Sequence, residues 1–160
     1  MTHPSMYFVA GILVGALVTG LIMWNRASDQ MLMEDLSTKG FAETVQAIQD
    51  QAEADGWKLP KIHEISNTVN EAGFDVLPVT VIELCKADIA GKVLSDEDGR
   101  RVASMMPCRV AVYENAAGDV VISRMNSALM SRMFGGIIQE AMTEAADGNE
   151  ALLAPVLKPE

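Results

Sequence analysis

The stretch "PCRVAVYENAAGDVVISRM", Pro107 to Met125, decides the fold predicted for this chain. Runs rich in valine flank "NAAG" and predict two antiparallel strands, at 109–114 and 119–125. Gly118 suits the positive φ that a tight hairpin turn requires. Proline has no backbone donor for a β-ladder, so we expect the first strand to begin just after Pro107.

The remaining sequence alternates predicted strands with predicted helices. The run "VTVIELC" is another clear strand, and an apolar stripe at helical spacing begins at Phe41. Pro60 confines its own extended segment to a sheet edge. The expected strands are 31–36, 57–65, 79–85, 109–114 and 119–125, and the expected helices are 41–56, 66–73, 86–94, 95–105 and a last one from 127 that Gly135 and Gly136 bend.

This order predicts an α/β (α+β) fold, a mixed β-sheet packed with helices in one small domain. We place that domain at residues 31–147. Residues 148–160 show only loose patterning and are expected to form a poorly ordered tail.

An uncharged apolar run, Met6 to Trp24, precedes the domain. At about 1.5 Å per helical residue it just spans a hydrocarbon core of about 30 Å. Tyr7 and Trp24 stand at its two ends, where interfacial aromatics belong. We therefore predict a transmembrane anchor at 6–24 and a linker at 25–30. A cleaved signal peptide ranks second, because no basic start and no small-residue cleavage site accompany the run.

The net charge of the chain limits the classes of partner that it can bind. With 12 Lys and Arg against 22 Asp and Glu, the formal net charge is −10. Such a body repels nucleic acid, so we expect no nucleic-acid partner. Arg26, just after the apolar run, would by the positive-inside rule place the domain in the cytoplasm.

Cys85 and Cys108 are the only cysteines, and each lies at the end of a predicted strand. They meet only if those strands run antiparallel. Three interpretations stay open: two buried free thiols, a disulfide, or a metal or reactive-thiol site. Arg109 would activate the Cys108 thiolate only if the turn at Pro107 breaks the strand alternation, which otherwise puts the two side chains on opposite faces.

His63 and Met106 complete the set of soft or borderline donors near the cysteines. Thiolate and thioether ligands together favour Cu(I), so a copper site on Cys85, Cys108, His63 and Met106 is one hypothesis. No C-x-x-C, C-x-x-C-H or H-E-x-x-H motif occurs, which leaves the thioredoxin-type, c-haem and zincin interpretations without support.

The segments "GWKLPKIHEI", "LPVTVIELCKADIAGKVL" and "MMPCRVAVYENAAGDVVISRMN", followed by "MFGG", resemble the bacterial and archaeal family called domain of unknown function 302. The resemblance implies a small α/β domain that pairs into homodimers and is often exported behind a membrane segment or signal sequence. It marks these positions: Gly56, Trp57, His63, Cys85, Ala90, Pro107, Cys108, Arg109, Tyr113, Gly118 and Asn126.

The apolar run predicts a single span in a bacterial inner membrane, and the resemblance implies a homodimer. We follow the export that the resemblance implies, rather than the Arg26 argument, and expect the domain in the periplasm. We expect a non-catalytic accessory role, with a small ligand or soft metal bound near Cys85, Cys108, Arg109 and His63. One alternative is a redox or sulfur-transfer enzyme that uses Cys108 as its nucleophile. Another is a structural adaptor for a membrane partner.

Overall fold

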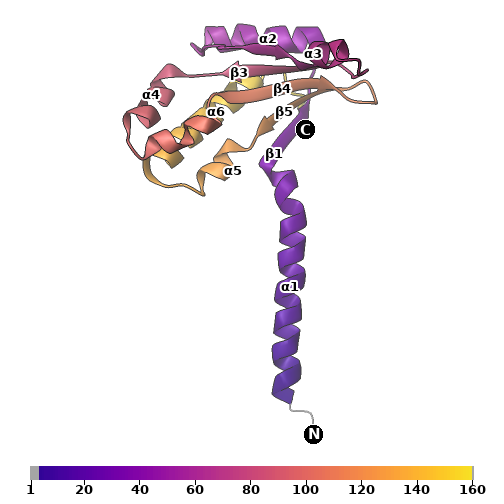
Figure 1. Cartoon of the computed structure of the whole chain (residues 1–160), viewed down its shortest axis with the longest axis vertical. Helices are drawn as coiled ribbons and strands as arrows, with labels where there is room; N and C mark the ends of the chain where they lie inside the picture. Colours follow the sequence, from indigo (N-terminus) through magenta and orange to yellow (C-terminus); the bar gives the residue numbers. More distant parts are fainter. Residues whose placement is uncertain (1–3, 160) are drawn as a thin grey trace.

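A long N-terminal helix leads into a compact sheet-and-helix domain (Figure 1). The computed structural model describes residues 4–159 and, within the first helix, the side chains of residue 8, residues 11–23 and residues 29–31. Helix α1 spans Pro4–Met31, so the expected linker at 25–30 is helical instead. Within the described residues, none of the helices combines the length and apolar character needed to cross a bilayer. The expected flanking aromatics, Tyr7 and Trp24, lie outside the described side chains.

The domain is built on one five-stranded sheet with the order β1-β5-β4-β3-β2. All of its pairings are antiparallel, which corrects the mixed sheet expected from the sequence. The reason is that each helical connection between neighbouring strands returns the chain to the sheet end it left. The strands are β1 (Leu32–Leu36), β2 (Ile62–Glu64), β3 (Val79–Leu84), β4 (Cys108–Glu114) and β5 (Val120–Met125).

The helices follow the predicted order, with one exception near the C-terminus. The expected last helix is two helices, because Gly136 adopts a φ of +54° where the second begins. The helices of the domain are α2 (Phe41–Ala54), α3 (Ile65–Glu71), α4 (Ala87–Ser95), the 3-10 helix η1 (Gly99–Met105), α5 (Ser127–Ser131) and α6 (Gly136–Leu153).

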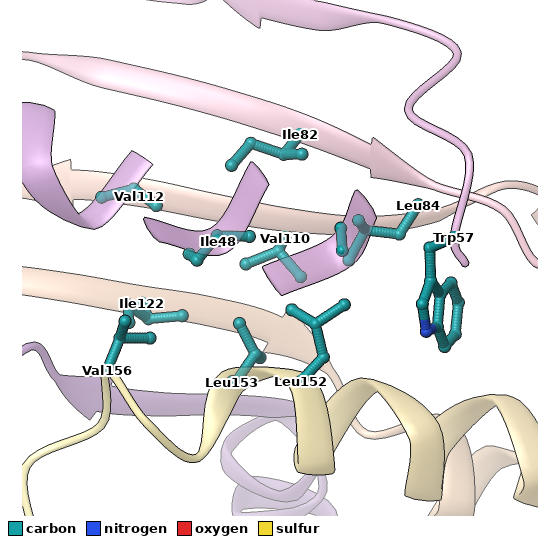
Figure 2. Packing of buried hydrophobic residues seen from close by; sticks show 11 residues of the cluster. Ile48, Trp57, Ile82, Leu84, Val110, Val112, Ile122, Leu152, Leu153 and Val156 are labelled. Carbon is teal, nitrogen blue, oxygen red and sulfur yellow. The ribbon is translucent and has the colours of Figure 1, made fainter. Parts of the chain in front are cut away.

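The main core lies between one face of the sheet and helices α2 and α6 (Figure 2). Alternate strand residues point to this face, as the strand period requires. Ile82, Val110 and Ile122 are fully buried there. The sheet-core cluster consists of Ile48, Ala52, Trp57, Ile82, Leu84, Val110, Val112, Ile122, Leu152, Leu153 and Val156.

A second buried cluster lies off one end of the sheet. We call it the end cluster, and it consists of Ile89, Val93, Val102, Ile138 and Ala141 from α4, η1 and α6. Helix α6 packs against both clusters. Its last turn and the residues after it enter the sheet core, so the expected loose tail from residue 148 is wrong.

Arg124 ties three elements of the domain together. Its side chain is 2% exposed, and its Nη1 donates a hydrogen bond to Asp35 Oδ2 on β1 at 2.6 Å. Its Nε and Nη2 donate to the two carboxylate oxygens of Glu150 on α6, at 2.7 and 2.5 Å. Burial lowers the pKa of Arg124, but the hydrogen bonds to Glu150 and Asp35 outweigh burial and raise it overall. The guanidinium therefore stays charged and holds β1, β5 and α6 in one arrangement.

Gly148 lets α6 approach the indole of Trp57. A Cβ at residue 148 would lie 2.9 Å from Trp57 Cζ2, so the buried indole or the helix would have to shift. Overpacking a core usually costs about 1–3 kcal/mol, and the better helix propensity of alanine returns up to about 1 kcal/mol.

We predict that Gly148→Ala lowers the free energy of unfolding by about 1 kcal/mol in urea denaturation of the full chain. Gly91→Ala is the matched control, since Gly91 also lies in a helix but has no atom within 4 Å of the point where a Cβ would stand. That variant should be as stable as the parent or more stable. Equal stability of the two variants would contradict the close approach.

Candidate ligand-binding site

A cavity of about 280 Å³ lies between the sheet-core cluster and the end cluster. Its existence follows from α6, which presents the small residues Ala141 and Ala145 where it passes from one cluster to the other. The lining comprises Trp57, Leu84, Cys85, Lys86, Ile89, Ala90, Val93, Val102, Ser104, Met105, Met106, Pro107, Cys108, Arg109, Met125, Ser127, Ala141, Met142, Ala145 and Asn149. The cavity is therefore mainly apolar, with a few polar groups.

Both cysteines line this cavity. Cys108 pairs with Leu84 across the antiparallel β3–β4 ladder, and Cys85 is the next residue after Leu84. The antiparallel alternative left open by the sequence is therefore the one that occurs, and it brings the cysteines to the same sheet end. Both are free thiols, so no disulfide joins them.

The Cys108 thiol is not activated. Burial raises its pKa, the neighbouring Cys85 raises it further, and a backbone hydrogen bond offsets only part of this. Because the thiolate is the nucleophile, a raised pKa leaves Cys108 protonated at neutral pH. The geometry therefore disfavours the interpretation of Cys108 as a reactive nucleophile.

Asn149 is the polar group that the cavity leaves without a partner. The residue is 7% exposed, and no described group forms a hydrogen bond with its Oδ1. It lies eight residues after Ala141 and four after Ala145, which puts all three on one face of α6. A buried acceptor without a partner costs about 1–3 kcal/mol, so a ligand that donates a hydrogen bond here would recover that cost.

Arg109 and His63 belong to a different environment from the thiols. Arg109 lies on the opposite sheet face from Cys108, as the strand alternation predicts, and its side chain is 65% exposed. Its Nε lies 3.8 Å from Glu83 Oε1, and His63 Nε2 lies 3.0 Å from the same oxygen. Arg109 still reaches the rim of the cavity, whereas His63 is not among the lining residues.

The predicted metal ligands are only partly brought together. Cys85, Cys108 and Met106 line the cavity, but His63 is engaged with Glu83 outside it. Across the part of the chain that the structure describes, no group of three or more His, Cys, Asp and Glu side chains is placed to hold a metal ion.

Sequence reasoning missed Asn149 because it was assigned to the loose tail. A signal was present: Ile138, Ala141, Ala145 and Leu152 trace an apolar stripe at helical spacing, and Asn149 occupies a position on it. A polar residue on such a stripe is a candidate for a buried hydrogen-bonding role.

Comparisons with known proteins agree with this fold. The family model described as Domain of unknown function DUF302 matches residues 34–158. A crystal structure of an uncharacterized conserved protein DUF302 from Bacillus stearothermophilus superposes with a TM-score of 0.69, at 19% sequence identity, over 78% of this chain and 96% of that one. At that identity the likeness shows the fold alone. No curated protein matches the chain.

We predict that Cys108 is alkylated by iodoacetamide with a pH midpoint above 8.5, the ordinary value for a thiol. The measurement uses Cys85→Ala, in which Cys108 is the only cysteine and burial still raises its pKa. Cys108→Ala reports the other thiol under the same conditions. A midpoint near 7 or below for Cys108 would contradict the prediction and restore the thiol-enzyme alternative.

Proposed function

Because the chain belongs to the DUF302 family, whose description assigns no activity, we propose its function from the cavity: it is a binding module for a small, mainly apolar ligand that donates a hydrogen bond. The family matches residues 34–158, which include every residue that lines the cavity. The homodimer and the periplasmic location stay predictions.

The observation that carries this proposal is the Oδ1 of Asn149. Buried polar groups in native structures almost always have partners, and exceptions call for an explanation. Here Asn149 lines a cavity of about 280 Å³, near the lower end of the usual size of ligand pockets, and its unpartnered Oδ1 is buried beside that cavity. The lining is mainly apolar, with Lys86 and Arg109 among its few polar groups, and the Cys108 thiol is neutral. This combination suits a ligand with one donor group and an apolar body.

The alternatives have less support. A thiol-dependent enzyme needs a thiolate, and the pKa of Cys108 is raised rather than lowered. The interpretation as a purely structural adaptor explains neither the cavity nor the unpartnered Asn149 oxygen.

We predict that Asn149→Leu, which keeps a similar volume, stabilises the ligand-free protein by about 1–3 kcal/mol while abolishing binding. The probe is 4-bromophenol, whose hydroxyl donates a hydrogen bond and whose bromine quenches tryptophan fluorescence. A Trp24→Phe background leaves Trp57, which lines the cavity, as the only tryptophan. The parent should bind 4-bromophenol about tenfold more tightly than 4-bromoanisole, which lacks the donor.

The matched control for this experiment is Gln139→Leu, which also replaces an amide on α6 but at an exposed position outside the cavity. It should keep the preference for the phenol. If Asn149→Leu keeps that preference, or if 4-bromophenol leaves Trp57 fluorescence unchanged in the parent, the proposed function is wrong.

We also propose that α1 holds the module in a membrane. The support is the uncharged sequence from Met6 to Trp24, of which the structure describes the side chains of residue 8 and residues 11–23. Every one of those described side chains is exposed, including Leu13 at 65% and Leu17 at 65%. A helix that exposes apolar groups all round needs an apolar surrounding.

The expected result is that the full chain stays in the membrane fraction after alkaline carbonate extraction. Leu13→Lys with Leu17→Lys should release it, because each lysine near a helix centre costs about 2.5–3.5 kcal/mol of insertion free energy. Leu94→Lys, at a leucine of the domain that is 41% exposed, is the control and should stay bound. Release of the parent chain by carbonate would refute the anchor.

A further inference from the structure

We propose that the cavity takes its ligand from the membrane: a single-chain amphiphile whose donor head reaches Asn149 and whose apolar chain leaves beside Met125. This inference rests on the proposed function, because it requires both a binding cavity and a membrane-held α1.

The cavity opens at the place where α1 joins the domain. Of the lining residues, only Ser104, Arg109 and Met125 are exposed, so they form its rim. Met125 pairs with Leu32 in the β1–β5 ladder, and Leu32 directly follows the last residue of α1. Paired residues on antiparallel strands lie about 5 Å apart between Cα atoms. Met125 on the rim is therefore one strand spacing from the end of α1, which continues for seven residues, about 10 Å, past the proposed membrane segment 6–24.

Hydrogen bonds fasten this junction. The backbone N–H of Asn126 donates to the carbonyl oxygen of Met31 at 2.8 Å. Its side-chain Nδ2 donates to the carbonyl oxygen of Gln30 at 3.1 Å. Asn126 directly follows the rim residue Met125, so the last turn of α1 cannot move away from the opening without breaking both bonds.

Exposed apolar side chains surround the same junction. We call them the apolar foot: Met31 at 44% exposed, Leu32 at 55%, Met125 at 46% and Met133 at 69%. Met133 follows α5, which packs against α1. Single exposed apolar residues need no explanation, but a group at the end of α1, about 10 Å beyond the apolar segment 6–24, fits contact with a lipid surface.

The size of the cavity sets how much of the ligand it can hold. A volume of about 280 Å³ equals roughly nine water molecules at about 30 Å³ each. That accommodates a head and the beginning of a chain, but not a whole lipid. The rest of the ligand's alkyl chain must lie outside the cavity. Exposure of that alkyl chain to water would be unfavourable, whereas the apolar foot and the membrane give it apolar surroundings.

The test compares two bromophenol probes, one without and one with an alkyl chain, on full-length protein in phosphatidylcholine nanodiscs, in the Trp24→Phe background. One probe is 4-bromophenol, and the other is a 2-bromophenol that carries a dodecyl chain at carbon 4. We expect the dodecyl probe, added to the bilayer, to quench Trp57, and Asn149→Leu to remove at least four-fifths of that quenching.

Variants at the apolar foot separate the exit path from the cavity. Met125→Asp places a charge on the exit path and should weaken the dodecyl probe at least fivefold more than it weakens 4-bromophenol. Met133→Asp is the matched control, because Met133 belongs to the apolar foot but does not line the cavity. It should leave both probes within twofold of the parent.

The outcomes distinguish the two levels of the proposal. If 4-bromophenol quenches in an Asn149-dependent manner but the dodecyl probe does not, the membrane source is wrong and the binding function stands. Equal effects of Met125→Asp on both probes would likewise refute the exit path. If neither probe quenches Trp57, the binding function and this inference both fail.

Discussion

The ion pairs of Arg124 fix the rotation of α6, and the rest of the domain depends on that rotation. Glu150 must face Arg124, because a buried guanidinium needs its carboxylate partners. Once Glu150 faces the sheet, the helical geometry fixes the directions in which its neighbours on α6 point. Leu153 turns into the sheet core, and Asn149 turns toward the cavity. The position of one cation on β5 thus decides which residue of α6 lines the site.

The contribution of these ion pairs is geometric more than energetic. Replacing a buried ion pair by apolar residues is often neutral or stabilising, so the charges of Asp35, Arg124 and Glu150 add little net free energy of folding. They do exclude other rotations of α6, since each alternative would leave a buried charge without its partner at a cost of about 3–5 kcal/mol. A domain stable by about 5–15 kcal/mol cannot tolerate that loss, so a single packing arrangement dominates.

Local sequence patterns predicted the elements well, because each depends on neighbouring residues. The hairpin at 107–125 forms with Gly118 at a φ of +84°, as its turn chemistry requires. The antiparallel sheet and the packing of α4 were not predictable in the same way. On α4 the buried residues are Ile89 and Val93, whereas the neighbouring apolar residue Leu94 is 41% exposed. The apolar residues of this short helix could form either of two buried faces. Packing against the end cluster determines which of the two is buried.

Only part of the candidate site could be predicted, namely the part that depends on the ends of neighbouring strands. Cys85 and Cys108 lie at strand ends, so the β3–β4 register alone brings them to one place, and an antiparallel pairing was one of the two possibilities that the sequence allowed. His63 was grouped with them by donor chemistry, but the β2–β3 register places it opposite Val81, beside Glu83 rather than at the cavity. Asn149 required the position and rotation of α6, which depend on contacts distant in sequence.

One sheet end combines three features that the sequence presents separately. The last residues of α1, the cysteines and the end cluster all lie there, because β1, β3, β4 and β5 align their ends in an antiparallel ladder. The ladder therefore does more than support a core. It places a cavity lined by Asn149, which has an unpartnered acceptor, at the sheet end where α1 joins the domain, so that the proposed ligand chemistry and the proposed route both start from the same set of strand registers.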